Sequence, residues 1–313
     1  MLFYVARRVI ATIPVVGVVA LFVFSLLYIS PGDPAVIIAG DQASTQDVER
    51  IRESLGLNEP LLSQFGAWLG RLFHADLGTS IFANQSVMHM IVQRIEPTLA
   101  LTVCSMTLTV LIAVPLGAIA AWKANTWIDR LVMALAVFGF SFPVFVIAYL
   151  LMFPFALWTT LLPVQGYVGI TEDFGSFLAH IAMPSLTLAI VFIALIARMT
   201  RASVLEVLSQ DYIRTAHSKG LRPSAVLFGH ALRNASVPIV TTIGLGIALL
   251  ISGVVVTETV FAIPGLGRLT VDSILRRDYP VIQGVVLVFS MSYVLINLLI
   301  DLSYTFLDPR IRY

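Results

Sequence analysis

Six long apolar runs constrain the fold of this chain more than any other feature of its sequence. A helix rises about 1.5 Å per residue, so roughly 20 apolar residues cross the ~30 Å hydrocarbon core of a bilayer. Because lipid offers no hydrogen-bond partners, only helices and closed barrels span it, and uninterrupted apolar runs favour helices. The sequence therefore predicts an all-α polytopic membrane protein with six transmembrane helices, at residues 9–29, 98–122, 131–158, 181–201, 238–257 and 283–306.

Composition agrees with a membrane protein and excludes several classes of function. Hydrophobic residues make up 58% of the chain and charged residues only 12%, whereas a soluble domain carries roughly 25% charged residues. The net charge is +1 and the basic residues form no long run, so we expect no nucleic-acid partner. Cys104 is the only cysteine and no Cys/His cluster occurs, so the sequence predicts neither an intrachain disulfide nor a metal site.

The distribution of Lys and Arg predicts the orientation of the spans. Arg7 and Arg8 precede a first apolar run of 21 residues, which exceeds the ~7–15 residues of a signal-peptide core and indicates an uncleaved helix. With a cytoplasmic N-terminus, twelve of the 19 basic residues lie on cytoplasmic segments and only three on the two shorter outer loops. The positive-inside rule therefore predicts that both termini are cytoplasmic.

We expect two parts along the chain. Residues 1–97 would form the first transmembrane helix plus an outer helical loop, and residues 98–313 a five-helix transmembrane domain. In the outer loop one helix is expected to end at Gly56, and Pro60 to open a second. The apolar positions of that second helix share one face and are Leu61, Phe65, Trp68, Leu69 and Leu72.

The largest cytoplasmic segment, residues 202–237, predicts two short helices that meet at a glycine. One helix is expected from Ser203 to Ser218, with Gly220 suited to end it. The other is expected from Arg222 to Asn234 and leads into the fifth span.

The sequence contains no motif for catalysis. It lacks the G-x-x-x-x-G-K-[ST] phosphate loop, the H-E-x-x-H zinc motif and the G-x-S-x-G nucleophile elbow. Its five histidines are scattered singly. We therefore expect a protein that is not an enzyme.

Ordered motifs carry a family resemblance. The glycine corner reads Asp211-Tyr212-Ile213-Arg214-Thr215-Ala216-His217-Ser218-Lys219-Gly220-Leu221. It resembles the E-A-A-x-x-x-G loop of ABC importer permeases, with Arg214-Thr215-Ala216 in place of E-A-A. Nearly the whole chain is similar to B-type permease subunits of the dipeptide/oligopeptide/nickel importer family. Further stretches that fit are Pro31-Gly32-Asp33-Pro34, Asp76-Leu77-Gly78, Arg198-Met199-Thr200-Arg201, Pro264-Gly265-Leu266-Gly267-Arg268 and Arg277-Asp278-Tyr279-Pro280.

This resemblance implies the type I ABC importer permease fold and a set of partners. The chain would be a transmembrane permease subunit in the bacterial inner membrane, passing short peptides by alternating access. ATP and Mg would bind two separate ATPase subunits, and this chain would hold no cofactor. Its other partners would be a second, homologous permease subunit, a periplasmic or lipid-anchored substrate-binding protein, and membrane lipid.

The resemblance also implies that the glycine corner docks in a groove of an ATPase subunit. Small residues there would permit close approach, and Arg214, Lys219 and Arg222 would pair with acidic groups on that partner. An ordinary basic inner loop that only satisfies membrane topology is the alternative. The expected docking residues are Asp211, Tyr212, Arg214, Thr215, Ala216, Lys219, Gly220 and Leu221.

Polar residues inside the spans are candidates for the translocation path. They are Thr98, Thr102, Ser105 and Thr109 on one face of the second span, and Asn297 on the sixth. Such stripes also join helices to one another, so both interpretations stand. Asp301 lies near the end of the sixth span, and if it is buried then Arg198 or Arg201 is its expected partner.

The outer loop at 258–281 carries charges that a peptide's termini would recognise. Glu258 would meet the amino terminus, and Arg276 or Arg277 the carboxylate. A structural ion-pair network among these residues is the alternative.

Glutathione and nickel complexes are alternative substrates for the same transporter type. An ion-coupled secondary transporter would need an ionisable site at the membrane midplane, and the spans contain no acidic relay.

Overall fold

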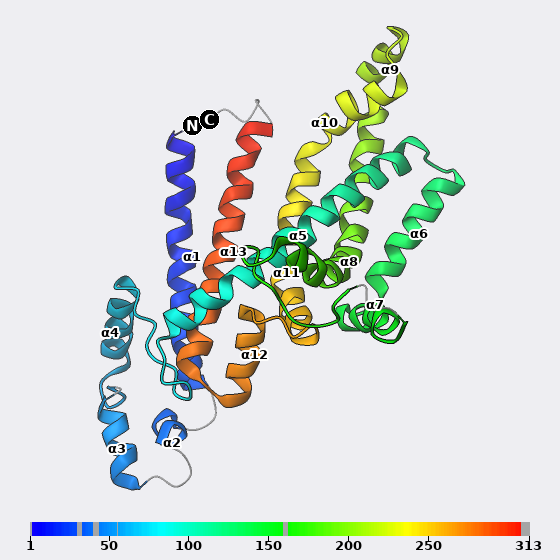
Figure 1. Cartoon of the computed structure of the whole chain (residues 1–313). Coiled ribbons are helices and arrows are strands. Elements are labelled where there is room, and N and C mark those ends of the chain that lie inside the picture. Colours follow the sequence, from blue (N-terminus) through cyan, green and yellow to red (C-terminus); the bar gives the residue numbers. More distant parts are fainter. Residues whose placement is uncertain (1, 30–32, 40–43, 55, 159–161, 308–313) are drawn as a thin grey trace. The chain divides into compact units, whose positions relative to one another are not determined.

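The computed structural model describes residues 2–29, 33–39, 44–54, 56–158 and 162–307. Within those ranges the secondary structure is helical, apart from an isolated bridge between Thr79 and Ser86. This confirms the all-α prediction. The helices labelled or visible in Figure 1 are α1 (Leu2–Ile29), α2 (Pro34–Ala39), α3 (Thr45–Ser54), α4 (Leu61–Phe73), α5 (Val87–Trp122), α6 (Trp127–Ser141), α7 (Val144–Trp158), α8 (Phe174–Leu208), α9 (Asp211–Ser218), η1 (Ala225–Ala231), α10 (Leu232–Asn234), α11 (Ser236–Val260), α12 (Leu266–Arg276) and α13 (Tyr279–Leu307).

The chain forms two compact units. The central unit comprises residues 96–267 and the chain from residue 296 onward. The N-terminal unit comprises residues 2–95 together with residues 268–295. The helices α5 and α13 therefore each begin in the N-terminal unit and continue into the central unit.

Among the described residues, five helices are long and apolar enough to cross a membrane. They lie in α1, α5, α8, α11 and α13, where five of the six predicted runs fall. Proline does not end them, because Pro14, Pro97, Pro115 and Pro184 all lie inside helices. With 36 residues in α5 and 35 in α8, these two helices also extend well beyond the predicted spans.

The third predicted span, at 131–158, is not one straight helix. It consists of α6 and α7, whose axes differ in direction by 101° (Figure 1). The break falls at Phe142, which has the extended backbone angles φ −101° and ψ 139°. Residue Pro143 explains this, since the proline ring disfavours the helical conformation in the residue before it. The pair is thus either a broken span or a re-entrant segment.

The helix α8 forms the centre of the central unit. It packs against α6, α7 and α11, and its residues Leu188, Phe192 and Ile196 lie in the buried apolar core. Glycines on α11 permit close packing against its neighbours. A Cβ atom added to Gly244 would clash with the side chain of Ile300, and one added to Gly253 would lie 2.9 Å from Leu188.

The N-terminal unit joins α1 to the predicted outer helices. The helix α3 is followed by Gly56 at φ +67°, and α4 begins directly after Pro60. The predicted apolar face of α4 rests on α1, where the ring of Phe24 lies 5.2 Å from Phe65 and 5.8 Å from Trp68. Aromatic pairs at these separations hold the outer helix on the first span.

Candidate functional site

The glycine corner is built from α9 and the turn that follows it. The amide of Lys219 donates to the carbonyl of Thr215 over 3.1 Å, and the amide of Gly220 donates to the carbonyl of His217 over 2.9 Å. Gly220 has φ +79°, a conformation that costs glycine little and strains other residues. The predicted role of Gly220 as the residue that ends this helix is therefore confirmed.

The predicted helix from Ser203 to Ser218 is wrong in one respect, because two helices cover it. The helix α8 ends at Leu208, and Gln210 is extended at φ −74° and ψ 148° before α9 begins. The hydroxyl of Ser209 donates to the carbonyl of Glu206 over 2.7 Å, a local bond that competes with helix continuation. As a result α9 is a separate eight-residue helix.

One face of α9 is buried within the central unit. Ile213 and Ala216 are 2% and 8% exposed, and they join an apolar cluster with Val204, Val226 and Leu227. Ala216 was expected to allow close approach of a partner. It instead allows α9 to pack closely on its own chain, and this packing fixes which face of α9 points outward.

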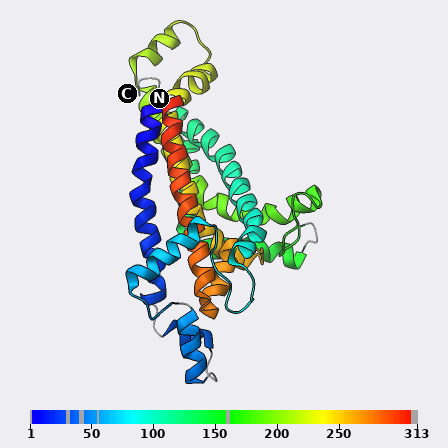
Figure 2. The same cartoon turned by 90° about the vertical axis from the view of Figure 1, so that its left-hand side faces the viewer.

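The opposite face of α9 and the turn after it are exposed. Arg214 contacts Asp211 at 3.4 Å, but both side chains are at least 80% exposed, so this pair contributes little stability. The exposed predicted docking residues are Asp211, Tyr212, Arg214, Thr215, Lys219, Gly220 and Leu221. Figures 1 and 2 show α9 and η1 lying together beyond one end of α8.

A second helix follows the corner as predicted, although its centre is wider than an α-helix. Residues 225–231 form the π-helix η1, which packs against α9. Asn234 then donates to the hydroxyl of Tyr212 over 2.8 Å. Sequence reasoning missed this bond, since the two residues are 22 positions apart and no local spacing relates them.

An ion pair links α6 to α8 and was also missed. The guanidinium of Arg201 donates to both carboxylate oxygens of Asp129, at 2.5 and 2.7 Å. The Asp129 side chain is only 5% exposed. The sequence predicted Arg198 or Arg201 as the partner of Asp301 if Asp301 is buried. Arg201 instead binds Asp129, so this prediction is wrong for Arg201.

The polar stripe predicted on the second span lies on α5. Ser105 and Thr109 are fully buried, and their hydroxyls donate to carbonyls four residues earlier, as does Thr102. Asn297 on α13 is half-buried. In this conformation the stripe thus faces protein, and its place in a translocation path stays a prediction.

Thr98, the first residue of that stripe, contacts Glu258. Its hydroxyl donates to the Glu258 carboxylate over 2.6 Å and accepts from the amide of Leu266 over 2.8 Å. Glu258 is fully buried, and Cβ atoms added to Gly265 or Gly267 would lie within about 3 Å of its carboxylate. Glu258 is therefore not exposed at a mouth in this structure, and its contact with a peptide stays a prediction.

Arg276 and Arg277 belong to the N-terminal unit and are both exposed. They lie where α12 ends, and Arg277 turns the chain at φ +57°. The next residue, Asp278, is buried and accepts a hydrogen bond of 2.5 Å from Ser80. The predicted role of the two arginines at an outer mouth stays a prediction.

Family models match nearly the full length of the chain. Residues 113–313 match the model described as binding-protein-dependent transport system inner membrane component. Residues 1–102 match the model for the N-terminal part of such membrane components.

Named relatives align over almost their whole length. A probable peptide ABC transporter permease protein of Sinorhizobium fredii is 51% identical over 310 residues, which cover 99% of both chains. A glutathione transport system permease protein of Pectobacterium atrosepticum is 44% identical over 313 residues, covering both chains fully. Among solved structures, an inward-facing MetNI methionine ABC transporter chain matches with a TM-score of 0.59 and 18% identity. That match covers 71% of this chain and 97% of the other.

Proposed function

This chain belongs to the family of binding-protein-dependent transport system inner membrane components, and we propose that it carries short peptides across the bacterial inner membrane. It is a permease subunit of an ATP-binding-cassette importer. We place ATP and Mg in two partner ATPase subunits, so that this chain supplies a path and no catalytic residue. The peptide assignment is supported by the 51% identical relative, which is named for peptide transport.

The observation that carries the coupling role is the two-sided construction of α9. Its inner face is fixed by Ile213 and Ala216 in the apolar cluster, while its outer face and the turn after it present Tyr212, Arg214 and Lys219. A short helix held in this way moves as one body with the helices beneath it. We propose that an ATPase subunit binds this outer face and that ATP-driven closure of the two ATPases moves the permease between its inward and outward states.

Orientation and assembly follow from the same proposal. Docking requires α9 to be cytoplasmic, which agrees with the excess of basic residues on that side and puts both termini in the cytoplasm. A second, homologous permease subunit would supply the other half of the path and the second docking helix. A periplasmic or lipid-anchored binding protein would deliver the peptide on the outer side.

Charge reversal on α9 tests the docking role directly. The double variant R214E/K219E should reduce recovery of ATPase subunits with the purified permease, by about fivefold for each interfacial charge. Arg130→Glu is a matched control, because Arg130 is also exposed and predicted to be cytoplasmic but lies outside α9. Equal recovery from the double variant and the control would contradict docking at α9.

The Gly220→Pro variant tests whether movement of the ATPase subunits is transmitted to the permease, and it leaves the charges of α9 unchanged. Proline fixes φ near −65° and has no amide hydrogen, whereas Gly220 has φ +79° and donates to His217. We expect the variant to insert in the membrane and to retain ATP hydrolysis by its partners while peptide uptake is lost. Unchanged uptake with normal subunit association would contradict the coupling role.

Glutathione is the alternative substrate with a specific observation behind it, since a 44% identical relative is named for glutathione transport. Nickel complexes are a third candidate within the transporter type. The ligands retained by the co-encoded binding protein decide among them: retention of dipeptides or oligopeptides supports our proposal, and retention of glutathione or nickel complexes alone rejects it.

A further inference from the structure

The N-terminal unit contains a cavity of about 280 Å³ that the coupling mechanism does not use. It is enclosed by α1, α4, the loop at 76–81 and the first turns of α13, all within that unit. Its volume lies near the lower limit of roughly 300 Å³ for small-molecule sites, which favours a small ligand.

The walls of the cavity are fixed by hydrogen bonds before any ligand arrives. The loop is held by Ser80, which donates to Asp278 over 2.5 Å, and by the amide of Val87, which donates to the carbonyl of Gly78 over 3.0 Å. Gln283 on α13 donates to the carbonyl of Val23 on α1 over 3.1 Å. A pocket held in this way loses little conformational entropy when it binds a ligand.

One side of the cavity is aromatic. Phe24, Tyr28 and Trp68 line it, and the rings of Phe24 and Trp68 lie 5.8 Å apart. The hydroxyl of Tyr28 donates to Gln64, whose amide nitrogen donates to the carbonyl of Glu59 over 2.7 Å. Because the Tyr28 hydroxyl and the Gln64 amide are hydrogen-bonded to protein, the rings on this side present an apolar surface to a ligand.

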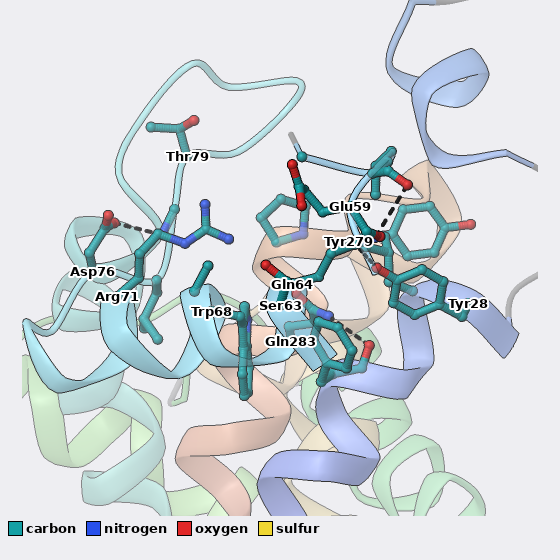
Figure 3. Close-up of a pocket in the computed structure, with 18 of the residues that line it drawn as sticks. Tyr28, Glu59, Ser63, Gln64, Trp68, Arg71, Asp76, Thr79, Tyr279 and Gln283 are labelled. Atoms are coloured by element: carbon teal, nitrogen blue, oxygen red, sulfur yellow. Dashed lines mark hydrogen bonds between the residues drawn. The ribbon is translucent and has the colours of Figure 1, made fainter. Parts of the chain in front are cut away.

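The open side carries one cation, Arg71, and two carboxylates, Glu59 and Asp76, and none of the three forms an ion pair with another described residue. Within the described parts of the chain, neither the Arg71 guanidinium nor the Glu59 carboxylate has an ion-pair partner within 4.0 Å. Both residues line the cavity, and Figure 3 shows their side chains extending toward the same open space above α4. Asp76 is nearby, but one of its oxygens already accepts from the amide of Gly78 over 2.9 Å.

From this arrangement we propose that the cavity binds a small zwitterion with an apolar body, of the kind formed by a dipeptide. The carboxylate of the ligand pairs with Arg71, its ammonium group pairs with Glu59, and its side chain lies against Trp68. Arginine suits the first role because its planar fork binds a carboxylate through two parallel hydrogen bonds. The site is separate from α9 and would exist whether or not α9 docks an ATPase.

Fluorescence of Trp68 provides the direct test. The chain has four tryptophans, so the variant W122F/W127F/W158F leaves Trp68 as the only emitter. The full-length chain in detergent is titrated with alanylphenylalanine, its C-terminal amide and its N-acetyl form. We expect saturable quenching by the free dipeptide with half-saturation at about 1 mM or below, and binding at least about threefold weaker for each blocked form.

Variants then assign the two ends of the ligand. Arg71→Ala should weaken binding of the free dipeptide roughly fivefold and leave binding of the C-terminal amide unchanged, while Arg71→Lys should restore part of the loss. Glu59→Gln should weaken binding of the dipeptide and leave binding of the N-acetyl form unchanged. Arg130→Ala and Glu53→Gln are matched controls, since both residues are exposed and neither lines the cavity.

A second measurement guards against damage from the tryptophan substitutions. The unsubstituted chain should show a rise in thermal unfolding temperature with the free dipeptide that is smaller with either blocked form. Absence of both quenching and thermal shift up to about 10 mM would overturn the proposal. Equal binding of all three compounds would also overturn it, because recognition of the two charged termini is its central claim.

Discussion

The hydroxyl of Thr98 donates a hydrogen bond of 2.6 Å to Glu258, although the two residues are 160 positions apart. The same hydroxyl accepts from the amide of Leu266, so one side chain joins α5, the end of α11 and the start of α12. A Cβ atom added to Gly265 would lie 2.1 Å from the Glu258 carboxylate, and one added to Gly267 would lie 3.0 Å from that carboxylate and 2.5 Å from the Cα of Val255. A buried carboxylate held in this way fixes the path of the turn.

Thr98→Val should destabilise the protein by about 1–3 kcal/mol, because valine keeps the shape of threonine but leaves two buried polar groups without this partner. Thr98→Ser should retain most of the stability, since serine keeps the hydroxyl. Thermal unfolding of the purified chain measures both. Thr107→Val is the control, because Thr107 lies on the same helix and is exposed. An equal, small effect at both positions would contradict a special role for Thr98.

Arg201→Ala should destabilise the protein by about 3 kcal/mol. It removes the bidentate partner of Asp129 and leaves a carboxylate that is 5% exposed without its countercharge. Arg198→Ala is a matched control on the same helix, since Arg198 is exposed, and there we expect a change within about 0.5 kcal/mol. If the two variants unfold at the same temperature, the ion pair does not stabilise the α6–α8 contact.

Gly117→Ala should destabilise the protein by about 1–3 kcal/mol through overpacking. The added Cβ would lie 2.5 Å from the backbone oxygen of Ala197 and 2.7 Å from the Cβ of Thr200, and neither atom moves without moving α8. Gly17→Ala is the control, because a Cβ there meets nothing within 4 Å and alanine favours a helix by up to about 1 kcal/mol. Thermal unfolding should therefore shift in opposite directions for the two variants.

Asp173 provides a prediction about pH. It caps α8 by accepting hydrogen bonds from the hydroxyl of Ser176 at 2.6 Å and the amide of Gly175 at 2.9 Å, and these bonds lower the pKa of Asp173 below its usual 3.8. A lowered pKa in the folded state means that the stabilisation is present above pH 3.8 and is lost as pH falls through the folded pKa.

Asp173→Ala should therefore lower the thermal unfolding temperature at pH 7 and have a progressively smaller effect below pH 3.8. Glu172→Ala is a close control, since Glu172 is the exposed acidic neighbour of Asp173 and is not the residue that caps α8. An effect of Asp173→Ala that stays constant from pH 7 to acid would show that capping by the carboxylate is not its cause.

Local patterns in the sequence were sufficient to predict the helical class, five spans and the glycine corner. The apolar run of α11 and the turn at Gly220 depend on interactions within a few residues, and such interactions can be read from spacing and residue type. The bend between α6 and α7 was missed although Pro143 was visible. Proline is tolerated inside α8 at Pro184, so the residue alone does not decide whether a helix breaks.

The contacts that define the sites were less predictable. The bond between Thr98 and Glu258 and the pair of Arg201 with Asp129 join residues far apart in the chain, and no periodicity within one helix relates them. The inner face of α9 shows the same limit. The sequence predicted these eight residues as part of a longer helix, and packing on η1 is what turns Ala216 toward the chain itself.

The length of α8 has a mechanical consequence. At about 1.5 Å per residue, its 35 residues measure roughly 50 Å, whereas a bilayer core is only ~30 Å thick. If α8 crosses the membrane along its normal, about 20 Å of the helix lies outside the hydrocarbon, shared between its two ends. Within the central unit α9 packs on η1 and η1 packs on α8, so a displacement of α9 would reach Leu188 and Phe192 through η1 and one continuous helix.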